Sequence, residues 1–448
     1  MRDVYSIFYI IMLTNKMKDG MNNNKNVLVF PCGSEIGLEI KRAVGHSTHF
    51  NLIGANSVDD HGRFVFEDYI GDVPYDNDEE FIPAMIEIVK KQKIDAVYPT
   101  VDTAIATLKS CEKELGCIVV APPSEACEIC LSKSKTYRAL QGLIPLPKTF
   151  DANENNLPFP LFAKPTIGHS GRDSKRLQNR LELDEYNADC NDFILCEYLP
   201  GDEYTIDCFT DRHGKLRFFQ SRVRRRVSNG ISVNTRAAEM PNVENFTMKI
   251  SSALNLRGAW FFQMKKDKDG HPKLMEVAAR FGGSSVLCRA QGVNLPLLSL
   301  FDAFDKDVEI IYNNYEVELD RALENLYKFN ISYKSVFLDY DDCLIINGKL
   351  NPEMVSFLAK CKNENKSVAL LSRHAGDLNT SLAQWGMSGF FNQVIHITDG
   401  SPKSKYIMGD APIFIDDSFA ERKEVKDALK IPVFGSDMIE CLVNGKMK

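Results

Sequence analysis

The segment LFAKPTIGHSGR at residues 161–172 places a lysine at the end of a short apolar strand, with a glycine loop directly after it. The lysine is Lys164, and the loop runs from Gly168 to Gly171. An ammonium group attracts phosphate charge, and glycines allow backbone amides to approach a ligand closely. Lys-Pro and Gly-Ser pairs are common, so the segment alone favours a triphosphate site without requiring one.

Polar residues on the strands that follow extend this predicted site. The segment EYLPGDE at 197–203 places acidic groups on both sides of a turn, where they suit ribose hydroxyls and a base edge. Gln263 and Glu276 end two neighbouring predicted strands, and Arg280 follows. Oxygen ligands on paired strands can hold magnesium between phosphates.

The chain before this segment alternates between strands and helices. Strands are predicted at 27–30, 50–55, 96–99 and 117–121, and helices at 79–93 and 102–115, with a further helical stretch after the turn at 31–37 that runs to Val44. Such alternation is typical of βαβ units with a parallel sheet, so a Rossmann-like domain is expected. The turn at 31–37, PCGSEIG, matches only part of a dinucleotide-binding fingerprint, and a scaffold turn is the favoured interpretation.

From residue 161 onward the pattern becomes β-rich. A helix is predicted at 132–141 and ends before Pro145 and Pro147. Strands are predicted at 161–164, 193–198, 204–210, 216–224, 258–265 and 273–277. This order favours an α+β domain.

Together these segments resemble the ATP-grasp superfamily, in its carbamoyl-phosphate-synthase-like and biotin-carboxylase-like branch. The resemblance covers residues 26–325, including the Rossmann-like front domain. Its marks, in order, are LSKSKTYRAL, LFAKPTIGHSGR, FILCEYLPGDEYTID, LRGAWFFQM and KLMEVAARFGGSS. It implies an ATP- and Mg²⁺-dependent ligase that activates a carboxylate as an acyl phosphate and passes it to an amine or a thiol.

The resemblance also implies roles for single residues. Those implied to bind ATP are Lys133, Lys164, Gly168, Ser170, Gly171, Glu197, Leu199 and Glu203. Gln263 and Glu276 would bind Mg²⁺, with Mn²⁺ as an alternative, and Arg280 would stabilise the group in transfer. The family usually has asparagine where this chain has Ala278, which removes one metal ligand and puts a second metal in doubt.

A second cluster of acidic residues follows the predicted strand in VFLDYDDCL, residues 336–344. Asp339 and Asp341 are two residues apart, so both can point into one site. Two carboxylates at a strand end suit a magnesium site with one nucleophile and one general acid or base. For this segment alone, an acidic loop that caps a helix would be the default interpretation.

Three later segments favour the catalytic interpretation. Ser372 ends the predicted strand at 368–371, and Lys403 stands at a predicted helix start, which is a good anion site. Asp416 and Asp417 follow the predicted strand at 412–415. The spacing also matters, because core elements fill the short intervals between these motifs and leave no room for an inserted domain.

The order Asp-x-Asp, Ser, Lys, Asp-Asp resembles the haloacid dehalogenase (HAD) superfamily from about residue 332 to the C-terminus. By that resemblance Asp339 forms a phosphoaspartate, Asp341 protonates the leaving group, and Ser372 and Lys403 hold the phosphoryl group. The residues implied to bind the metal are Asp339, Asp341 and Asp416. Cys343 replaces the usual threonine.

Length and composition agree with this plan. A chain of 448 residues predicts about three domains, and its net charge of −7 argues against a dedicated nucleic-acid binder. The predicted parts are a tail at 1–25, which is disordered or an over-extended start, a Rossmann-like domain at 26–122, an ATP-grasp domain at 123–328 and a capless HAD-like domain at 329–448. Twelve scattered cysteines favour a reducing cytoplasm.

The sequence therefore predicts a bifunctional cytoplasmic enzyme of mixed α/β and α+β domains, a ligase joined to a phosphatase. Its partners would be a small-molecule carboxylate, a nucleophile and a phosphorylated metabolite, with no nucleic acid and no membrane; a homodimer stays open. One alternative is a phosphatase whose ATP-grasp half only binds nucleotide, as a sensor or scaffold. A less favoured alternative is an interaction protein that uses both folds as platforms.

Overall fold

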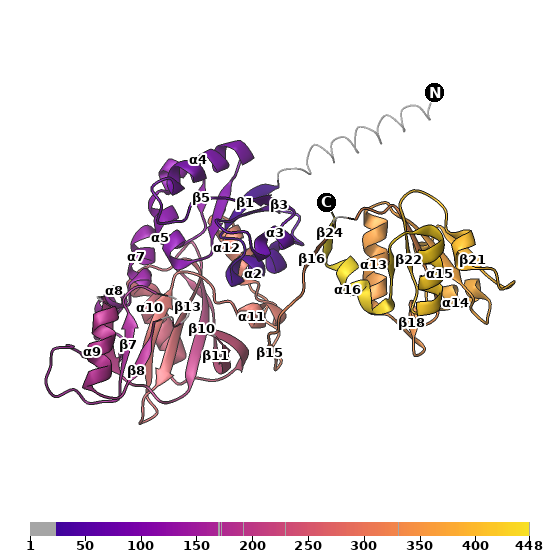
Figure 1. The fold of residues 1–448 in the computed structure, drawn as a ribbon. Coiled ribbons are helices and arrows are strands. Elements are labelled where there is room, and N and C mark those ends of the chain that lie inside the picture. The colour runs from indigo at the N-terminus through magenta and orange to yellow at the C-terminus, as the bar shows by residue number, and fades with distance from the viewer. Residues whose placement is uncertain are drawn as a thin grey trace. The chain divides into compact units, whose positions relative to one another are not determined.

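The computed structural model describes residues 24–168, 171, 173–190, 192–228, 230–329 and 331–447. Contacts divide the chain into two compact units, residues 1–322 and 323–448 (Figure 1). Residues 1–23 of the predicted tail, and Ser170 of the predicted phosphate loop, lie outside the described residues. Within the described part, no helix combines the length and apolar character needed to cross a bilayer.

The first unit begins with a parallel sheet of five strands in the order β3-β2-β1-β4-β5. Its strands are β1 Lys25–Phe30, β2 Phe50–Ala55, β3 Asp68–Ile70, β4 Ala96–Pro99 and β5 Ile118–Val119. The helices around it are α2 Glu35–Val44, α3 His61–Val65, α4 Phe81–Gln92, α5 Asp102–Ser110 and α6 Glu112–Leu115. The predicted alternation of strands and helices is confirmed, but the helix expected at 102–115 is interrupted at Cys111, and α3 and β3 were not predicted.

Two further sheets complete the first unit, a four-stranded one in the order β6-β9-β7-β8 and a six-stranded antiparallel one in the order β14-β13-β10-β11-β12-β15. Their strands are β6 Thr149–Phe150, β7 Leu161–Pro165, β8 Lys175–Leu177, β9 Phe193–Glu197, β10 Glu203–Thr210, β11 Leu216–Ser228, β12 Ile231–Ala237, β13 Gly258–Lys266, β14 Pro272–Ala278 and β15 Glu318–Asp320. The helices are α7 Ser124–Leu131, α8 Lys133–Leu140, α9 Arg180–Asp189, α10 Val243–Leu254, α11 Val286–Ala290 and α12 Leu295–Ala303.

The second unit is built on a parallel sheet of five strands in the order β21-β20-β17-β22-β23. Its strands are β17 Ser335–Leu338, β20 Ser367–Ser372, β21 Gln393–His396, β22 Pro412–Ile415 and β23 Val433–Phe434. Two separate two-stranded sheets consist of β16 Tyr327–Phe329 with β24 Gly445–Met447, and of β18 Ile345–Ile346 with β19 Lys349–Leu350. The helices are α13 Pro352–Asn363, α14 Leu378–Gln384, α15 Phe419–Leu429 and α16 Ile439–Val443, with short 3₁₀ turns η1 Ser388–Phe390, η2 Lys403–Tyr406 and η3 Ser436–Met438.

The prediction of a helix that starts at Lys403 is wrong. The chain forms only the single 3₁₀ turn η2, because β22 begins at Pro412 and little chain is left between them. A single turn has no substantial macrodipole, so the helix-start argument for an anion site at Lys403 does not hold. Any attraction of Lys403 for an anion would therefore come from its own ammonium group.

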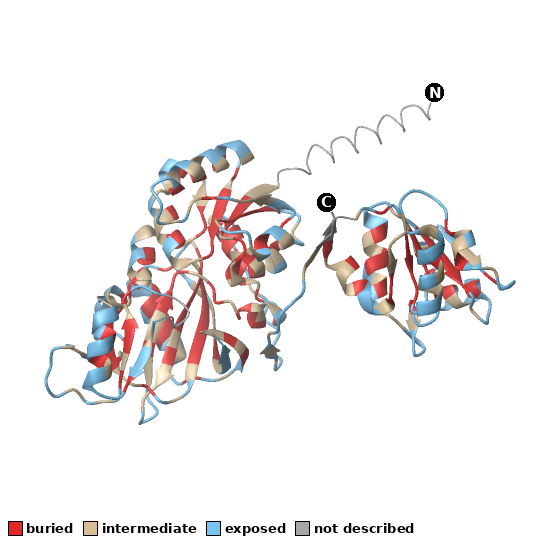
Figure 2. Cartoon of the chain, viewed as in Figure 1, coloured by how far each residue is buried: buried red, intermediate tan, exposed pale blue. Residues whose placement is uncertain are grey.

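Two arginines of strand β11 form ion pairs, one of them buried and the other exposed. Figure 2 shows the buried residues running along the central strands of each unit. Arg222 Nε lies 2.6 Å from Asp207 Oδ2 on β10, and the two side chains are 3% and 0% exposed. Arg225 reaches Glu318 of β15 at 3.0 Å, with both side chains 49% exposed. The two pairs should therefore contribute differently to stability.

We expect Arg222→Ala to lower the free energy of unfolding of the first unit by about 3–5 kcal/mol, because it leaves the Asp207 carboxylate buried without a cation. Arg225→Ala is the matched control and should cost about 0.2–1 kcal/mol. Urea unfolding in a Trp385→Phe background follows this unit alone, since Trp260 is then the single tryptophan. Equal losses in the two variants would contradict the expectation.

Candidate functional sites

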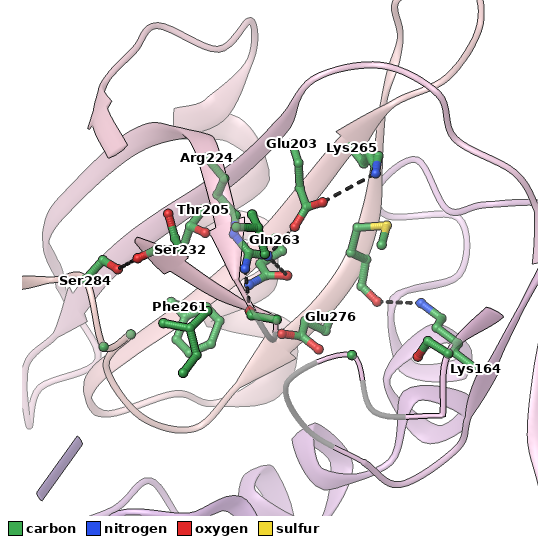
Figure 3. A pocket seen from close by; sticks show the side chains of 18 of the residues that line it. Lys164, Glu203, Thr205, Arg224, Ser232, Phe261, Gln263, Lys265, Glu276 and Ser284 are labelled. Atoms are coloured by element: carbon green, nitrogen blue, oxygen red, sulfur yellow. Dashed lines mark hydrogen bonds and ion pairs between the residues drawn. The ribbon is translucent and has the colours of Figure 1, made fainter. Parts of the chain in front are cut away.

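Strand register brings polar side chains of the six-stranded sheet together on one face. On β10, Glu203 and Thr205 are opposite Lys265 and Gln263 of β13, and Gln263 is opposite Glu276 of β14. Residues two apart on a strand point to the same face, so these side chains share one face of the sheet. Figure 3 shows them converging on one pocket. The two residues predicted to lie on neighbouring strands, Gln263 and Glu276, are thus directly paired.

A cavity of about 280 Å³ lies over this face of the sheet. The predicted site residues that line it are Lys133, Lys164, Gly168, Gly171, Glu203, Gln263, Glu276 and Arg280. Glu197 and Leu199 do not line it. The Glu197 carboxylate accepts a hydrogen bond from the Lys148 amide at 2.8 Å, and Leu199 is buried. The predicted phosphate and metal residues therefore come together, and the two predicted adenine residues lie apart from them.

The two lysines of the cavity are held by neutral oxygens. Lys164 is buried on β7, and its ammonium donates to the Tyr137 hydroxyl at 2.8 Å and the Met275 carbonyl at 2.9 Å. Lys133 begins α8, which Ser132 caps, and donates to the Gly168 carbonyl at 3.0 Å. Burial lowers the pKa of both lysines. Among the described residues neither ammonium has a carboxylate ion-pair partner.

The arginines of the same cavity are paired with carboxylates. Arg224 forms an ion pair with Glu203, and Lys265 lies 3.4 Å from the same carboxylate. Arg280 donates to both oxygens of Asp102, at 2.9 and 3.0 Å. Burial opposes the charge of Arg280, but the Asp102 carboxylate outweighs it and raises the pKa. Asp102 opens α5 next to the front sheet, so this contact joins two sheets.

The opposed Gln263 and Glu276 fit a divalent cation. Glu276 makes no hydrogen bond or ion pair with another described residue, so both of its oxygens are available. Gln263 accepts a long contact of 3.4 Å from Arg224. An amide oxygen and a carboxylate facing one another are ligands that Mg²⁺ accepts. Ala278 ends β14 and offers no ligand atom, which agrees with the departure noted in the sequence.

A second cavity of about 600 Å³ adjoins the first. It lies at the carboxyl ends of β1 and β4, where the chain crosses from one side of the front sheet to the other, the usual ligand position in open parallel sheets. Lys133, Glu276 and Arg280 line both cavities. A molecule in the second cavity would therefore meet the same side chains as one in the first.

The second unit brings four predicted residues to one edge of its sheet. Asp339, Ser372 and Asp416 stand at the carboxyl ends of the adjacent parallel strands β17, β20 and β22. The Lys403 ammonium lies 2.9 Å from Asp339 Oδ1 and 2.6 Å from Asp416 Oδ2. All four residues are buried. Asp341 is more exposed and contacts His374 Nδ1 at 3.0 Å.

Burial and charge set the proton affinities in this cluster. Burial raises the pKa of Asp339 against the opposing effects of Lys403 and Ser372. Burial, together with the Asp339 charge, raises the pKa of Asp416 to about 6. Burial opposes the charge of Lys403, but its two carboxylates outweigh that effect and raise its pKa. The ammonium is thus held in its charged form between two acids.

Several site residues were not identified from the sequence. Asp102 is 178 positions from its partner Arg280, and no local pattern links them. His374 gave no signal beside Asp341, since their contact depends on the order of two strands. Lys265 could have been found, because it lies two residues after Gln263 on a predicted strand and so shares its face.

Comparison with known proteins agrees with the geometry of the first unit. Residues 189–322 match the family model described as ATP-grasp in the biosynthetic pathway with Ter operon. No curated protein sequence matches the chain. The family model covers β10, β11, β13 and β14, the strands that carry Glu203, Gln263 and Glu276.

Three solved structures share the fold at low sequence identity. Biotin carboxylase from Campylobacter jejuni, in a β,γ-ATP complex, is 16% identical with a TM-score of 0.55, covering 66% of this chain and 74% of that one. The L-amino acid ligase from Bacillus licheniformis is 22% identical with a TM-score of 0.52, covering 62% and 74%. N5-carboxyaminoimidazole synthetase from Staphylococcus aureus, complexed with ADP, is 14% identical with a TM-score of 0.56, covering 67% and 83%. The family model and this shared fold together support an ATP-grasp assignment for the unit that holds the two adjoining cavities.

Proposed function

We propose that the first unit is an ATP-dependent ligase that joins a carboxylate to an amine or a thiol. The observation that carries this proposal is the pair of cavity lysines, Lys133 and Lys164, whose hydrogen bonds go to neutral oxygens. A cavity ammonium without a carboxylate partner retains its attraction for an anion, most strongly at Lys164, which is buried, whereas Lys133 is partly exposed. The polyphosphate of ATP is the anion that best suits two such lysines next to a glycine loop.

The proposed reaction has two steps. An oxygen of the substrate carboxylate attacks the γ-phosphorus of ATP, the bond to ADP breaks, and an acyl phosphate forms. The amine or thiol then attacks the acyl carbon and phosphate leaves. Lys164 lines the first of the two cavities and not the second, so ATP is assigned to the first. The other substrates are assigned to the adjoining cavity, which shares Lys133 and Arg280 with the first. Mg²⁺, held by Gln263 and Glu276, would neutralise phosphate charge.

We expect Lys164→Met to weaken ATP binding roughly 10- to 150-fold, because a charge-assisted hydrogen bond is worth about 1.5–3 kcal/mol. It should also remove ADP formation in the presence of mixed carboxylates and amines. Lys175→Met on β8 is the control, since that lysine is exposed outside the cavity. Equal ATP affinity in the two variants would contradict the site. If the unchanged protein binds ATP but forms no ADP with any mixture of carboxylates and amines, the result would favour the alternative of a nucleotide sensor.

We propose phosphatase activity for the second unit, on the strength of a separate observation. A buried lysine lies between two carboxylates at the carboxyl edge of a parallel sheet, with a serine on the neighbouring strand. In the proposed reaction an Asp339 oxygen attacks the phosphorus and the ester bond breaks. Asp341 gives a proton to the leaving oxygen, and water later releases phosphate from Asp339. Ser372 and Lys403 would hold the phosphoryl oxygens, and Mg²⁺ beside Asp339 would neutralise their charge.

Replacing Asp339 with asparagine should lower the hydrolysis of p-nitrophenyl phosphate by at least roughly a thousandfold, because the covalent route needs the carboxylate. Asp342→Asn is the matched control. Asp342 is exposed and has a positive φ of 52°, which asparagine tolerates, so this variant should hydrolyse the ester at the rate of the unchanged protein. The phosphatase proposal fails if Asp339→Asn retains the activity.

A further inference from the structure

A thiol points into the acidic cluster of the second unit. The ligand atoms of Asp339, Cys343 and Asp417 all lie within 4.8 Å of one another. Asp339 follows β17, Cys343 lies four positions further along, and Asp417 follows the adjacent parallel strand β22. Cys343 is fully buried. Two neighbouring strands thus bring two oxygen donors and one sulfur donor to one point.

The donors of this cluster are only partly engaged by the protein. Asp339 is 7% exposed, and its Oδ1 makes no hydrogen bond with a described residue, although the Lys403 ammonium lies 2.9 Å away. The Asp417 carboxylate likewise makes no hydrogen bond or ion pair with a described residue. Asp416 differs, because Lys403 and the Ser418 amide bind its two oxygens. Asp417, rather than Asp416, is therefore the carboxylate with oxygens to spare.

We propose that Asp339, Cys343 and Asp417 bind a thiophilic divalent cation such as Zn²⁺, with the Cys343 sulfur as a direct ligand. Zinc accepts sulfur and carboxylate ligands at about 2.0–2.3 Å, so small side-chain adjustments bring the three donors around one ion. Binding releases the thiol proton to solvent, and no group is oxidised or reduced. Magnesium has little affinity for sulfur, so the thiol favours zinc over magnesium at this place.

The site has a consequence for the chemistry proposed above. A zinc ion bound to Asp339 would occupy the carboxylate assigned as nucleophile. Zinc should therefore inhibit ester hydrolysis even when magnesium is in excess. The metal site itself does not depend on phosphatase activity, and its test below does not use that activity.

The test is titration of the full-length, reduced, metal-free chain with Cd²⁺ and Co²⁺, followed by the thiolate-to-metal charge-transfer absorption in the near ultraviolet. Cys343→Ser should remove the absorption of the strongest site and weaken Zn²⁺ binding at least about 100-fold, since even outer-shell changes cost about 10- to 100-fold. Cys361→Ser on α13 is the control. Cys361 is also buried in this unit but outside the cluster, so both signals should persist.

A second variant keeps the proposal testable if Cys343→Ser does not fold. Asp417 is exposed, so Asp417→Asn should preserve the fold, lower the Zn²⁺ affinity and retain the charge-transfer band at saturation. Unchanged affinity in Asp417→Asn, or an unchanged band in a folded Cys343→Ser protein, would overturn the proposal. A band in a protein that hydrolyses no ester with magnesium alone, before Cd²⁺ or Co²⁺ is added, would instead support the metal site and count against the phosphatase.

Discussion

The contact between Arg280 and Asp102 joins the two sheets on which the first unit depends. Asp102 opens α5 after the front-sheet strand β4, and Arg280 follows β14 of the six-stranded sheet. The guanidinium binds both carboxylate oxygens, a geometry that restricts orientation as well as distance. Both site cavities are lined by Arg280, so their shapes depend on where this pair holds the sheets.

The buried lysine of each unit has different neighbours, and these neighbours decide whether its charge is already balanced within the protein. Lys164 donates to a hydroxyl and a carbonyl, so its charge is available to an incoming anion. Lys403 lies between Asp339 and Asp416, so its charge is already balanced within the protein. Lys403 therefore holds two carboxylates at the sheet edge, and the phosphoryl contact proposed above would come in addition to these ion pairs. A further cation would bind through Asp339 and Asp417.

Much of the fold was predictable because local patterns report burial. The mainly apolar runs of β2, β4 and β22 match their predicted bounds, since strands buried in a parallel sheet are largely apolar. The polar residue of β2, Asn51, is exposed. Strand β12 was missed because it follows the polar run of β11, where Arg225 and Arg226 face β15 rather than a core. The turn at Lys403 was predicted as a helix because sequence preference alone does not register how little chain separates it from β22.

The sequence by itself determined which residue types stand at the strand ends, and from these lysines, carboxylates and glycines the chemistry of each site was predicted. It also indicated that Gln263 and Glu276 end two neighbouring strands, and the register of β13 and β14 pairs them directly. Only the tertiary structure decided which charges are neutralised. Strand order brings Arg280 to Asp102 and His374 to Asp341. It also brings Cys343 close to Asp417. Strand order itself is set by packing between segments that are distant in the chain.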